Sequence, residues 1–329
     1  MTVEDMKPTD AVALYLEDRA AELADLTLAG YRSRLGTFTD WLDVDMMSEI
    51  TPLILKQYKA ERAPELAEDS LKGQLDTLRH FIRWSETLGL VESGMHKSVV
   101  SPAGGEQRST TLSAERADAI LGYLERYERA SFDHTLLTTM WHTSLRTGSL
   151  RALDVEDIHT GDGWLDVQHR PETNTPLKNG NDGERPVSIS PRVADLLSEH
   201  LHHRRIDKDD DSGRTPFFTS RYGRRSATNI RMIVYRWTRP CVIGQECPVG
   251  RDPAECEAAV DNRLAGKCPE SVSPHAIRRG AITHFLSEDV EPTDVSARAD
   301  VSMGVLRKHY DVRTPHDKMN QRRGSFDAL

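Results

Sequence analysis

The chain has 329 residues, a formal net charge of −9 and 37% hydrophobic residues. This length exceeds the common size of one domain, and the composition is that of a globular chain. No apolar run reaches the roughly 18 residues that a membrane span requires. The acidic start also lacks the apolar segment of a signal peptide. We therefore expect two domains, a cytoplasmic location and no membrane association.

The negative charge argues against a simple basic nucleic-acid binder. Two interpretations are open. Either the chain does not bind DNA, or acidic surfaces solvate it at high salt while basic residues gather on one binding face. The basic residues are mostly Arg, which is the better bidentate ligand for phosphate. Scarce Lys beside abundant Asp and Glu resembles salt-adapted, archaeal-type proteins, but composition alone leaves the choice open.

Residues 1–93 are expected to be entirely helical. Apolar residues recur there every three or four positions, which predicts four amphipathic helices. Thr9 and Thr27 are expected to cap the first two, Thr51 and Pro52 to open the third, and Gly89 to close the fourth. Gly and Pro with few apolar residues then mark a linker at about 94–110. The first domain is thus predicted over residues 1–105.

Several basic residues of this first domain are candidate phosphate contacts, although such residues are more often a solvated face. They are Arg32, Arg34, Lys56, Lys59 and Lys72.

The second domain, 106–329, is predicted to be mainly α with a small β-sheet. Ser113 is expected to cap its first helix. Residues 164–169 and 185–190 alternate apolar and polar side chains, as strands do. Asn179-Gly180 is a strong turn signal, so Lys178 is expected on a β-hairpin at the sheet's edge. Residues 191–204 and the Arg-rich stretch 224–239 predict helices, the latter either a DNA contact or a solvated face.

The four cysteines all fall within residues 241–268. Their clustering predicts a shared role, most simply one structural zinc site formed by Cys241, Cys247, Cys256 and Cys268. No Cys-x-x-Cys pair is present, so separate reduced thiols, or disulfides in an oxidising compartment, remain alternatives.

One stretch near the end, 271–310, carries the strongest pattern. Ser273 and Pro274 suit an N-cap and a first helical turn. His275 and Arg278 are three apart, so they share one face of that helix, whose N-terminus favours anions. Tyr310 follows 32 residues after Arg278, after a short helix that Ser302 is expected to cap. The pattern predicts a phosphate-binding site.

This His-x-x-Arg pattern with its spaced Tyr resembles the carboxyl-terminal signature of the tyrosine recombinases, the phage-integrase and Xer-like family. Two upstream segments strengthen the resemblance. Thr143-Ser-Leu-Arg-Thr-Gly-Ser-Leu-Arg-Ala-Leu153 is similar to the family's segment with the first catalytic arginine, placing it at Arg146. Lys178 before Asn-Gly, followed by Arg185-Pro-Val-Ser-Ile189, is similar to the family's lysine hairpin.

The resemblance implies a helical, SAM-like core-binding domain that clamps DNA, followed by a catalytic domain. It implies cleavage through a 3′-phosphotyrosyl link to Tyr310, strand exchange, and a Holliday junction in a homotetramer, with a monomer expected in solution. Two guanidiniums, of Arg146 and Arg278, can stabilise charge on the nonbridging oxygens without a cofactor. Lys178 is the candidate acid for the departing 5′-oxygen, and His275 can accept the Tyr310 proton or orient the phosphate.

Two positions depart from the family pattern. A supporting Glu is replaced by Ser149, and the His or Trp nine residues before the tyrosine is replaced by Val301. The insertion at 241–268 is also long for the family, and the polar tail, 312–329, is of a kind that contacts a neighbouring protomer in the family. Beside a recombinase or integrase, two hypotheses stay open: a type IB topoisomerase, and a DNA-binding relic with impaired catalysis.

Overall fold

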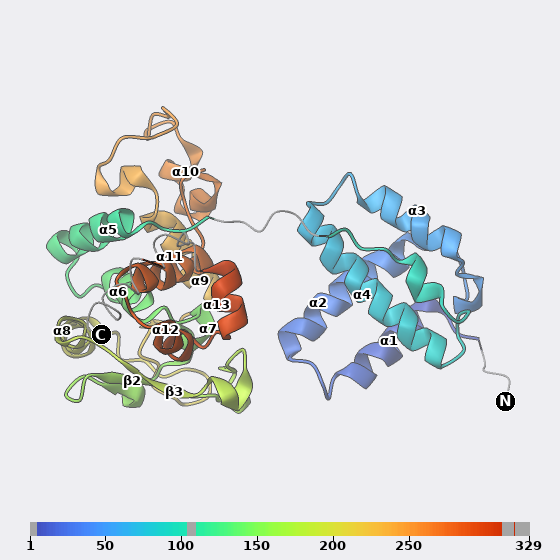
Figure 1. The fold of residues 1–329 in the computed structure, drawn as a ribbon, viewed down its shortest axis with the longest axis horizontal. Coiled ribbons are helices and arrows are strands. Elements are labelled where there is room, and N and C mark those ends of the chain that lie inside the picture. Colours follow the sequence, from blue (N-terminus) through green and yellow to red (C-terminus); the bar gives the residue numbers. More distant parts are fainter. Residues whose placement is uncertain (1–4, 104–109, 311–318, 320–329) are drawn as a thin grey trace. The chain divides into compact units, whose positions relative to one another are not determined.

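The structure is a computed structural model that describes residues 5–103, 110–310 and 319 (Figure 1). The chain forms two compact units, Met1–Ser109 and Thr110–Leu329. Apart from residue 319, the predicted tail lies outside the described residues, as does part of the predicted linker. No helix in the described ranges is long and apolar enough to cross a membrane.

Within its described residues, 5–103, the smaller unit contains four α-helices and two short 3₁₀-helices (Figure 1). Large apolar side chains from all four helices form one core, in which Tyr15, Phe38, Tyr58 and Phe81 are almost fully buried. The elements are α1 (Pro8–Arg19), α2 (Asp25–Trp41), η1 (Met47–Glu49), α3 (Pro52–Arg62), α4 (Glu68–Thr87) and η2 (Met95–Ser98).

The predicted helix ends of this unit are confirmed at two positions and wrong at two. Thr51 accepts a hydrogen bond from the Ile54 amide, with Pro52 in the first turn of α3. Gly89, after α4, adopts a positive φ of 72°. Thr9 and Thr27 are not N-caps, because α1 and α2 begin one and two residues earlier, at Pro8 and Asp25. Pro at the first position has set the start of α1.

Three of the five candidate phosphate contacts have internal hydrogen bonds. Lys59 Nζ donates to the Val100 carbonyl at 2.7 Å and Lys72 Nζ to the Ala103 carbonyl at 2.9 Å. Arg34 donates to the Thr77 hydroxyl at 3.1 Å. Arg32 and Lys56 remain exposed. Lys59 and Lys72 therefore hold the last described residues of this unit against α3 and α4.

The larger unit is mainly α, as predicted. Its helices are α5 (Ala114–Tyr127), α6 (Phe132–Thr143), α7 (Thr147–Ala152), α8 (Pro191–Glu199), α9 (Ala227–Trp237), α10 (Glu257–Val260), α11 (Pro274–Ser287), α12 (Pro292–Ala299) and α13 (Met303–His309). Ser113 caps α5, as predicted, by accepting from the Arg116 amide. A short π-helix, His200–Arg204, continues α8.

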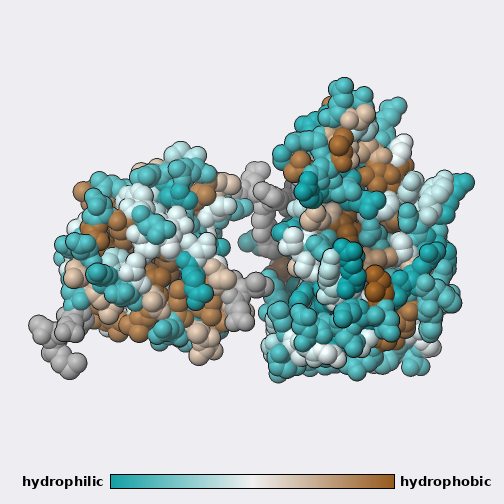
Figure 2. Space-filling view, turned by 180° about the vertical axis from the view of Figure 1, so that it is seen from behind, coloured by the Kyte–Doolittle hydropathy of each residue, from teal (hydrophilic) through white to brown (hydrophobic). Residues whose placement is uncertain are grey.

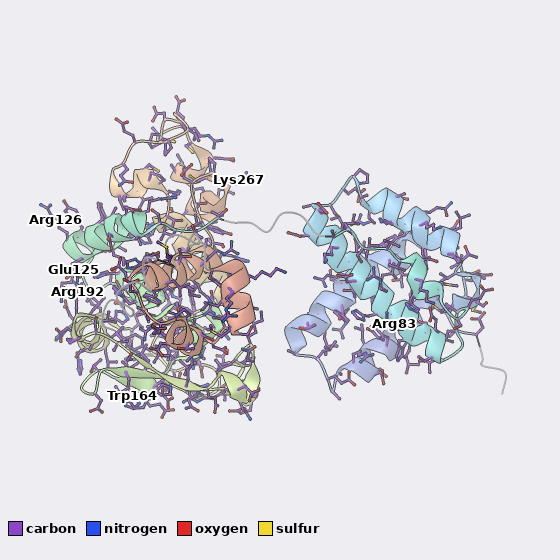
Figure 3. The ribbon with its side chains drawn as sticks, in the orientation of Figure 1. Arg83, Glu125, Arg126, Trp164, Arg192 and Lys267 are labelled. Atoms are coloured by element: carbon purple, nitrogen blue, oxygen red, sulfur yellow. The ribbon has the colours of Figure 1, made fainter. Side chains whose placement is uncertain are left out.

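The predicted hairpin is confirmed. Strands β1 (Ile158–His159), β2 (Trp164–Val167) and β3 (Arg185–Ser188) form an antiparallel sheet in that order. Leu165 pairs with Val187 and both face the core, whereas Trp164, labelled in Figure 3, stacks on His159 at a centroid distance of 3.9 Å. A second sheet pairs β4 (Thr219–Ser220) with β5 (Gly223–Arg224).

The Arg-rich stretch differs from the prediction. Its helix begins at Ala227, and Arg224 lies in β5 with only 4% of its side chain exposed. Arg224 donates to Asp154, which is buried, and to Asp210. Arg239 is also buried and donates to Asn262. A buried Arg requires carboxylate or amide partners, so these two residues brace the fold rather than face DNA.

Helix α11 lies in the middle of the larger unit (Figure 1). It contacts α5, α6, α9 and α12, and its residues Ala276, Ile277 and Ala281 belong to the main core. Gly280 allows its close approach to the chain before α5: a Cβ added there would lie 2.0 Å from the Leu112 carbonyl oxygen. The Leu112 amide in turn donates to the Ala276 carbonyl at 3.2 Å.

We expect Gly280→Ala to destabilise the larger unit by ~1–3 kcal/mol or more, because the added methyl must displace backbone. Gly122→Ala is the matched control, since Gly122 lies in α5 with open space around it. That change is expected to be neutral or stabilising by up to about 1 kcal/mol through helix propensity. Chemical denaturation of both variants measures this. Equal free energies of unfolding for the two variants would contradict the close approach.

Candidate active site

The first turn of α11 presents two of the predicted site residues. Ser273 accepts a hydrogen bond from the Ala276 amide, and Pro274 occupies the first turn, as predicted. This start places His275 and Arg278 one turn apart. His275 is exposed to solvent, whereas Arg278 is only 2% exposed.

The buried Arg278 guanidinium ties three segments together. Its Nη1 donates to the Ser144 carbonyl at 2.6 Å and its Nη2 to the Ala299 carbonyl at 2.5 Å. Ser144 ends α6 in the left-handed region, with φ 53°, so its carbonyl turns away from the helix. Arg278 therefore holds α11 against the end of α6 and the end of α12.

Arg146 lies at the turn between α6 and α7, as the residue that precedes α7. Its Nη1 forms an ion pair with the Asp300 carboxylate, and its Nη2 donates to the Asp300 carbonyl at 2.5 Å. The side chain keeps 24% of its surface exposed. Arg146 and Arg278 thus contact consecutive residues of the chain, Asp300 and Ala299. Burial lowers the pKa of Arg278, and the charge of Arg146 lowers it further.

Tyr310 directly follows α13, which Ser302 caps as predicted. Its ring centroid lies 6.4 Å from that of His275, and its carbonyl accepts from the Thr283 hydroxyl of α11 at 3.1 Å. Tyr310 packs into a small apolar cluster with Leu306 and Val301. Val301, at the position of the family's His or Trp, is 8% exposed and belongs to this cluster.

Lys178 is exposed, in the connection between β2 and β3. Its charge acts on His275, because it is one of the cations that lower the pKa of that ring. Its neighbour Asn179 donates from Nδ2 to Asp300 Oδ1 at 2.7 Å. The connection that carries Lys178 is thereby hydrogen-bonded to Asp300, the residue that pairs with Arg146.

The structure therefore brings together five predicted residues from segments more than 160 positions apart: Arg146, Lys178, His275, Arg278 and Tyr310. The replaced Ser149 is buried in α7.

The cationic surroundings change the protonation of this site. Partial desolvation lowers the pKa of His275 first, even though part of its ring is exposed, and the charges of Arg279, Arg278, Lys178 and Arg146 lower it further. Burial, then Arg146, lowers the pKa of Arg278, while a hydrogen bond with Tyr310 raises it. An anion such as a phosphate oxygen is the group whose arrival relieves this repulsion.

The sequence patterns did not identify Asp300, Asn179 and Arg185 as site residues. Arg185 donates from Nε to the Arg298 carbonyl at 2.9 Å, beside the residues that Arg278 and Arg146 contact. Asp300 lies 154 positions after Arg146, and no spacing rule joins an Arg and an Asp so far apart. The backbone of Asp300 has a positive φ of 51°. Asp tolerates the left-handed conformation, so its residue type was the one available sequence signal.

The four cysteines lie apart from this site, in a segment around α10 that extends from one end of the larger unit (Figure 1). All four line one cavity of about 20 Å³, and none forms a disulfide. Among the described residues, no three or more His, Cys, Asp or Glu side chains are already arranged to hold a metal ion. The predicted zinc site is therefore a convergence of thiols rather than a formed ligand set.

We expect the His275 ring of the DNA-free protein to titrate below its ordinary value of 6.5. The unfolded chain then binds this proton at higher pH than the folded chain, so the contribution of His275 to stability rises as pH increases from its folded pKa to about 6.5. NMR titration, with His275→Gln to assign the signal, measures the midpoint. A midpoint at or above 6.5 would contradict the cationic environment.

Comparisons with known proteins show which sequences and folds this chain resembles. No protein-family model matches the chain. A tyrosine recombinase XerC of Pelobacter propionicus is 25% identical over 288 residues, covering 85% of this chain and 82% of that relative. The Tn1549 transposon integrase in complex with a circular intermediate DNA has a similar fold, with a TM-score of 0.73 at 12% identity over 97% of this chain and 99% of that one. A lambda integrase tetramer bound to a Holliday junction gives 0.65 at 16% identity over 95% and 80%.

Three observations therefore agree: the spaced signature residues, the fold and the sequence match over most of the chain. The chain is similar in sequence to tyrosine recombinases and in fold to integrases.

Proposed function

We propose that this protein is a site-specific DNA recombinase that cuts and rejoins strands through a 3′-phosphotyrosyl intermediate. The convergence of Arg146, His275 and Arg278 beside Tyr310 carries the proposal. A phosphodiester under attack gathers negative charge on its nonbridging oxygens, and fixed guanidiniums stabilise that charge. A tyrosine that packs against the same helix is positioned to attack.

The remaining roles follow from the chemistry of each group. Tyr310 attacks phosphorus, the bond to the 5′-oxygen breaks, and the DNA becomes linked to Tyr310 through its 3′-phosphate. Lys178 supplies the proton that the departing 5′-oxygen needs. His275, whose pKa is lowered by partial burial and then by its cationic neighbours, accepts the Tyr310 proton or orients the phosphate. A phenolate is also a fair leaving group, so the step reverses when a 5′-hydroxyl attacks.

Two alternatives share this site. A type IB topoisomerase would use the same residues to relax DNA without a target sequence. A DNA-binding relic is suggested by Val301, which is packed among apolar side chains and offers the phosphate no hydrogen bond. The recombinase is favoured because the smaller helical unit precedes a complete set of Arg146, Lys178, His275, Arg278 and Tyr310.

Double-stranded DNA is the proposed partner, bound as a homotetramer in the synapse and as a monomer in solution, within the cytoplasm. The solved complexes of the similar Tn1549 and lambda integrases hold DNA, and one is a tetramer on a Holliday junction. Phosphate contacts in the smaller unit are assigned to the exposed Arg32 and Lys56, since the other three candidates are engaged internally.

Covalent trapping tests the function. Nicked suicide duplexes, tiled across the DNA on both sides of the coding gene, are expected to give a covalent adduct with the wild-type protein. Tyr310→Phe should bind the same duplexes and form no adduct. Tyr222→Phe is the control, since Tyr222 is 77% exposed. An adduct with Tyr310→Phe sinks the assignment, and relaxation of a plasmid without flanking DNA would favour the topoisomerase.

The same assay tests the acid. Lys178→Ala should slow cleavage roughly 10²–10⁴-fold, as loss of a general acid does. A duplex whose 5′-bridging oxygen is sulfur should largely restore its rate, because a thiolate leaves without a proton. The cleavage rate of Arg146→Ala should rise much less on the sulfur duplex. Lys208 is an exposed lysine elsewhere in this unit, and Lys208→Ala should cleave both duplexes as the wild type does. If sulfur leaves Lys178→Ala slow, Lys178 is not the acid.

We also propose that Cys241, Cys247, Cys256 and Cys268 bind one structural zinc ion. Their shared cavity of about 20 Å³ has room for a single water-sized sphere, and four thiolates are a preferred zinc ligand set. The side chains need to turn inward to reach bonding distance, because they do not yet form a ligand group.

The segment around α10 has few other interactions that could stabilise it. Helix α10 has four residues, too few for an isolated helix to be stable. The segment buries Ala258 and Ala265, both small, while Val249 and Val260 stay 46% and 70% exposed. A segment with so little apolar burial needs a metal or disulfides to hold its shape.

Elemental analysis of the purified protein is expected to give one zinc per chain. Chelation should lower the melting temperature of the wild type but leave Cys241→Ser, which has lost a ligand, unaffected. Mass spectrometry with and without reduction separates the disulfide alternative. Zinc near zero in freshly purified protein, with melting indifferent to chelator, means that the thiols are free.

A further inference from the structure

Three consecutive carbonyl oxygens at the C-terminal end of α12 each accept a hydrogen bond from a different arginine. The Arg298 carbonyl accepts from Arg185 at 2.9 Å. The Ala299 and Asp300 carbonyls accept from Arg278 and Arg146, each at 2.5 Å. The last carbonyls of a helix have no partner within it and carry partial negative charge. The end of α12 therefore satisfies these groups with guanidiniums.

Asp300 adds a full negative charge to this row. One carboxylate oxygen, Oδ2, pairs with Arg146, and the other, Oδ1, accepts from Asn179 at 2.7 Å. Asn179 is the residue next to Lys178. A single side chain thus connects the arginine at the start of α7 with the connection that carries the lysine.

The backbone fixes where this carboxylate lies. Asp300 is the C-cap of α12, with φ 51° and ψ 59°, a left-handed conformation that Asp and Asn tolerate and Gly adopts freely. Its amide donates to the Ala297 carbonyl at 3.3 Å, and the next amide, of Val301, donates to Ser296 at 3.1 Å. The side chain is therefore held from a closed helix end rather than from a loose loop.

We propose that Asp300 is a positioning residue: its carboxylate fixes the Arg146 guanidinium and the Lys178-bearing connection relative to each other before DNA binds. The inference rests on the proposed recombinase function of this site. A guanidinium has five N–H donors, and Asp300 occupies one donor on Nη1 and one on Nη2. The three that remain are enough to hold a phosphate oxygen pair.

Repulsion among the cations explains why such a group is needed. Burial and then the charges of Arg146 and Arg298 lower the pKa of Arg185, whereas Asp300 raises it. The same Arg146 charge acts on Arg278 and His275. Without DNA, no phosphate offsets this repulsion, and a partly exposed guanidinium such as that of Arg146 would turn toward water if it lost its partner. Asp300 keeps it in place.

An opposite role is conceivable for the same contact. The carboxylate would then stand where the scissile phosphate binds, and Arg146 would have to release it before cleavage. The bond from Arg146 to the Asp300 carbonyl disfavours this view, because release of the side chain leaves that second contact intact. The two roles predict opposite changes in cleavage rate.

Asp300→Asn and Asp300→Gly test the proposal, because both replacements suit the left-handed backbone and keep the carbonyl contact. We expect DNA affinity to be unchanged or tighter, since a negative charge is removed. The single-turnover rate of adduct formation on the nicked flanking duplexes should fall about 10-fold to 10²-fold, as small misplacements of catalytic groups do. Asn, which still accepts hydrogen bonds, should lose less than Gly.

Asp289 provides the matched control. It is an exposed Asp at a positive φ of 61°, so Asp289→Asn and Asp289→Gly repeat the chemical change away from Arg146 and should leave the rate unchanged. In an Arg146→Ala background, Asp300→Asn should cause little further loss, because Asp300 acts through Arg146. If Asp300→Asn acted only by disturbing the fold, it would further lower the cleavage rate of Arg146→Ala and would also weaken DNA binding.

Failure of this inference is distinguishable from failure of the function. If the wild type forms no adduct, the proposed function is wrong. If it does, and the Asp300 variants cleave as fast as wild type or faster, Asp300 does not position Arg146. Side-chain NMR of DNA-free protein gives a second readout. The Arg146 guanidinium signals, assigned with Arg146→Lys, should show hindered rotation that Asp300→Gly abolishes, and unchanged signals would overturn the proposal.

Discussion

The site depends on the end of one short helix. Helix α12 has eight residues, yet its last carbonyls accept hydrogen bonds from Arg185, Arg278 and Arg146. These arginines come from β3, α11 and the turn before α7, which share no sequence neighbourhood. A helix C-terminus is suited to this task, because it offers several unpaired acceptors in a small space, with a dipole that favours cations. The chain continues from this helix end through α13 to Tyr310. The carbonyl oxygens that orient the arginines therefore also fix where the segment leading to Tyr310 begins.

Such a cluster of cations costs stability, and the fold offsets the cost in two ways. Arg278 is buried with backbone carbonyls as partners, and a charged group in that position is far less costly than an unpaired one. Helix α11, which carries it, is held in the core by close backbone contact at Gly280. Val301, Leu306 and Tyr310 pack in one apolar cluster with Ile282 and Leu286 of the same helix. Val301 therefore contributes packing at a position where relatives are expected to supply a polar group, and the site relies more heavily on its arginines.

Sequence patterns predicted the fold class, the hairpin and the helix ends that depend on local chemistry, such as Thr51-Pro52, Ser113, Ser273-Pro274 and Ser302. They failed where a competing local signal was stronger, as at Thr9 next to Pro8. The patterns also failed where tertiary contacts bury a residue that was expected at the surface. Arg224 and Arg239 belong to a stretch predicted to contact DNA or to form a solvated face. Both side chains are instead buried and donate to Asp154 and Asn262. The five candidate site residues came from a resemblance in spacing. Asp300 was out of reach, because its role exists only when two segments 154 residues apart meet.

The acidic net charge of −9 is compatible with a phosphate site because the relevant field is local. Salt screens exposed charges beyond roughly 8–10 Å, so surface carboxylates elsewhere do little to an anion held against Arg146 and Arg278. Figure 2 shows hydrophilic residues over much of the visible face of each unit, which solvates the protein without neutralising the cluster. Asp300 is the carboxylate that reaches into it, and it does so through contacts to Arg146 and Asn179. A carboxylate at that point weakens long-range attraction for DNA while sharpening the geometry that cleavage needs, so specificity is favoured over non-specific affinity.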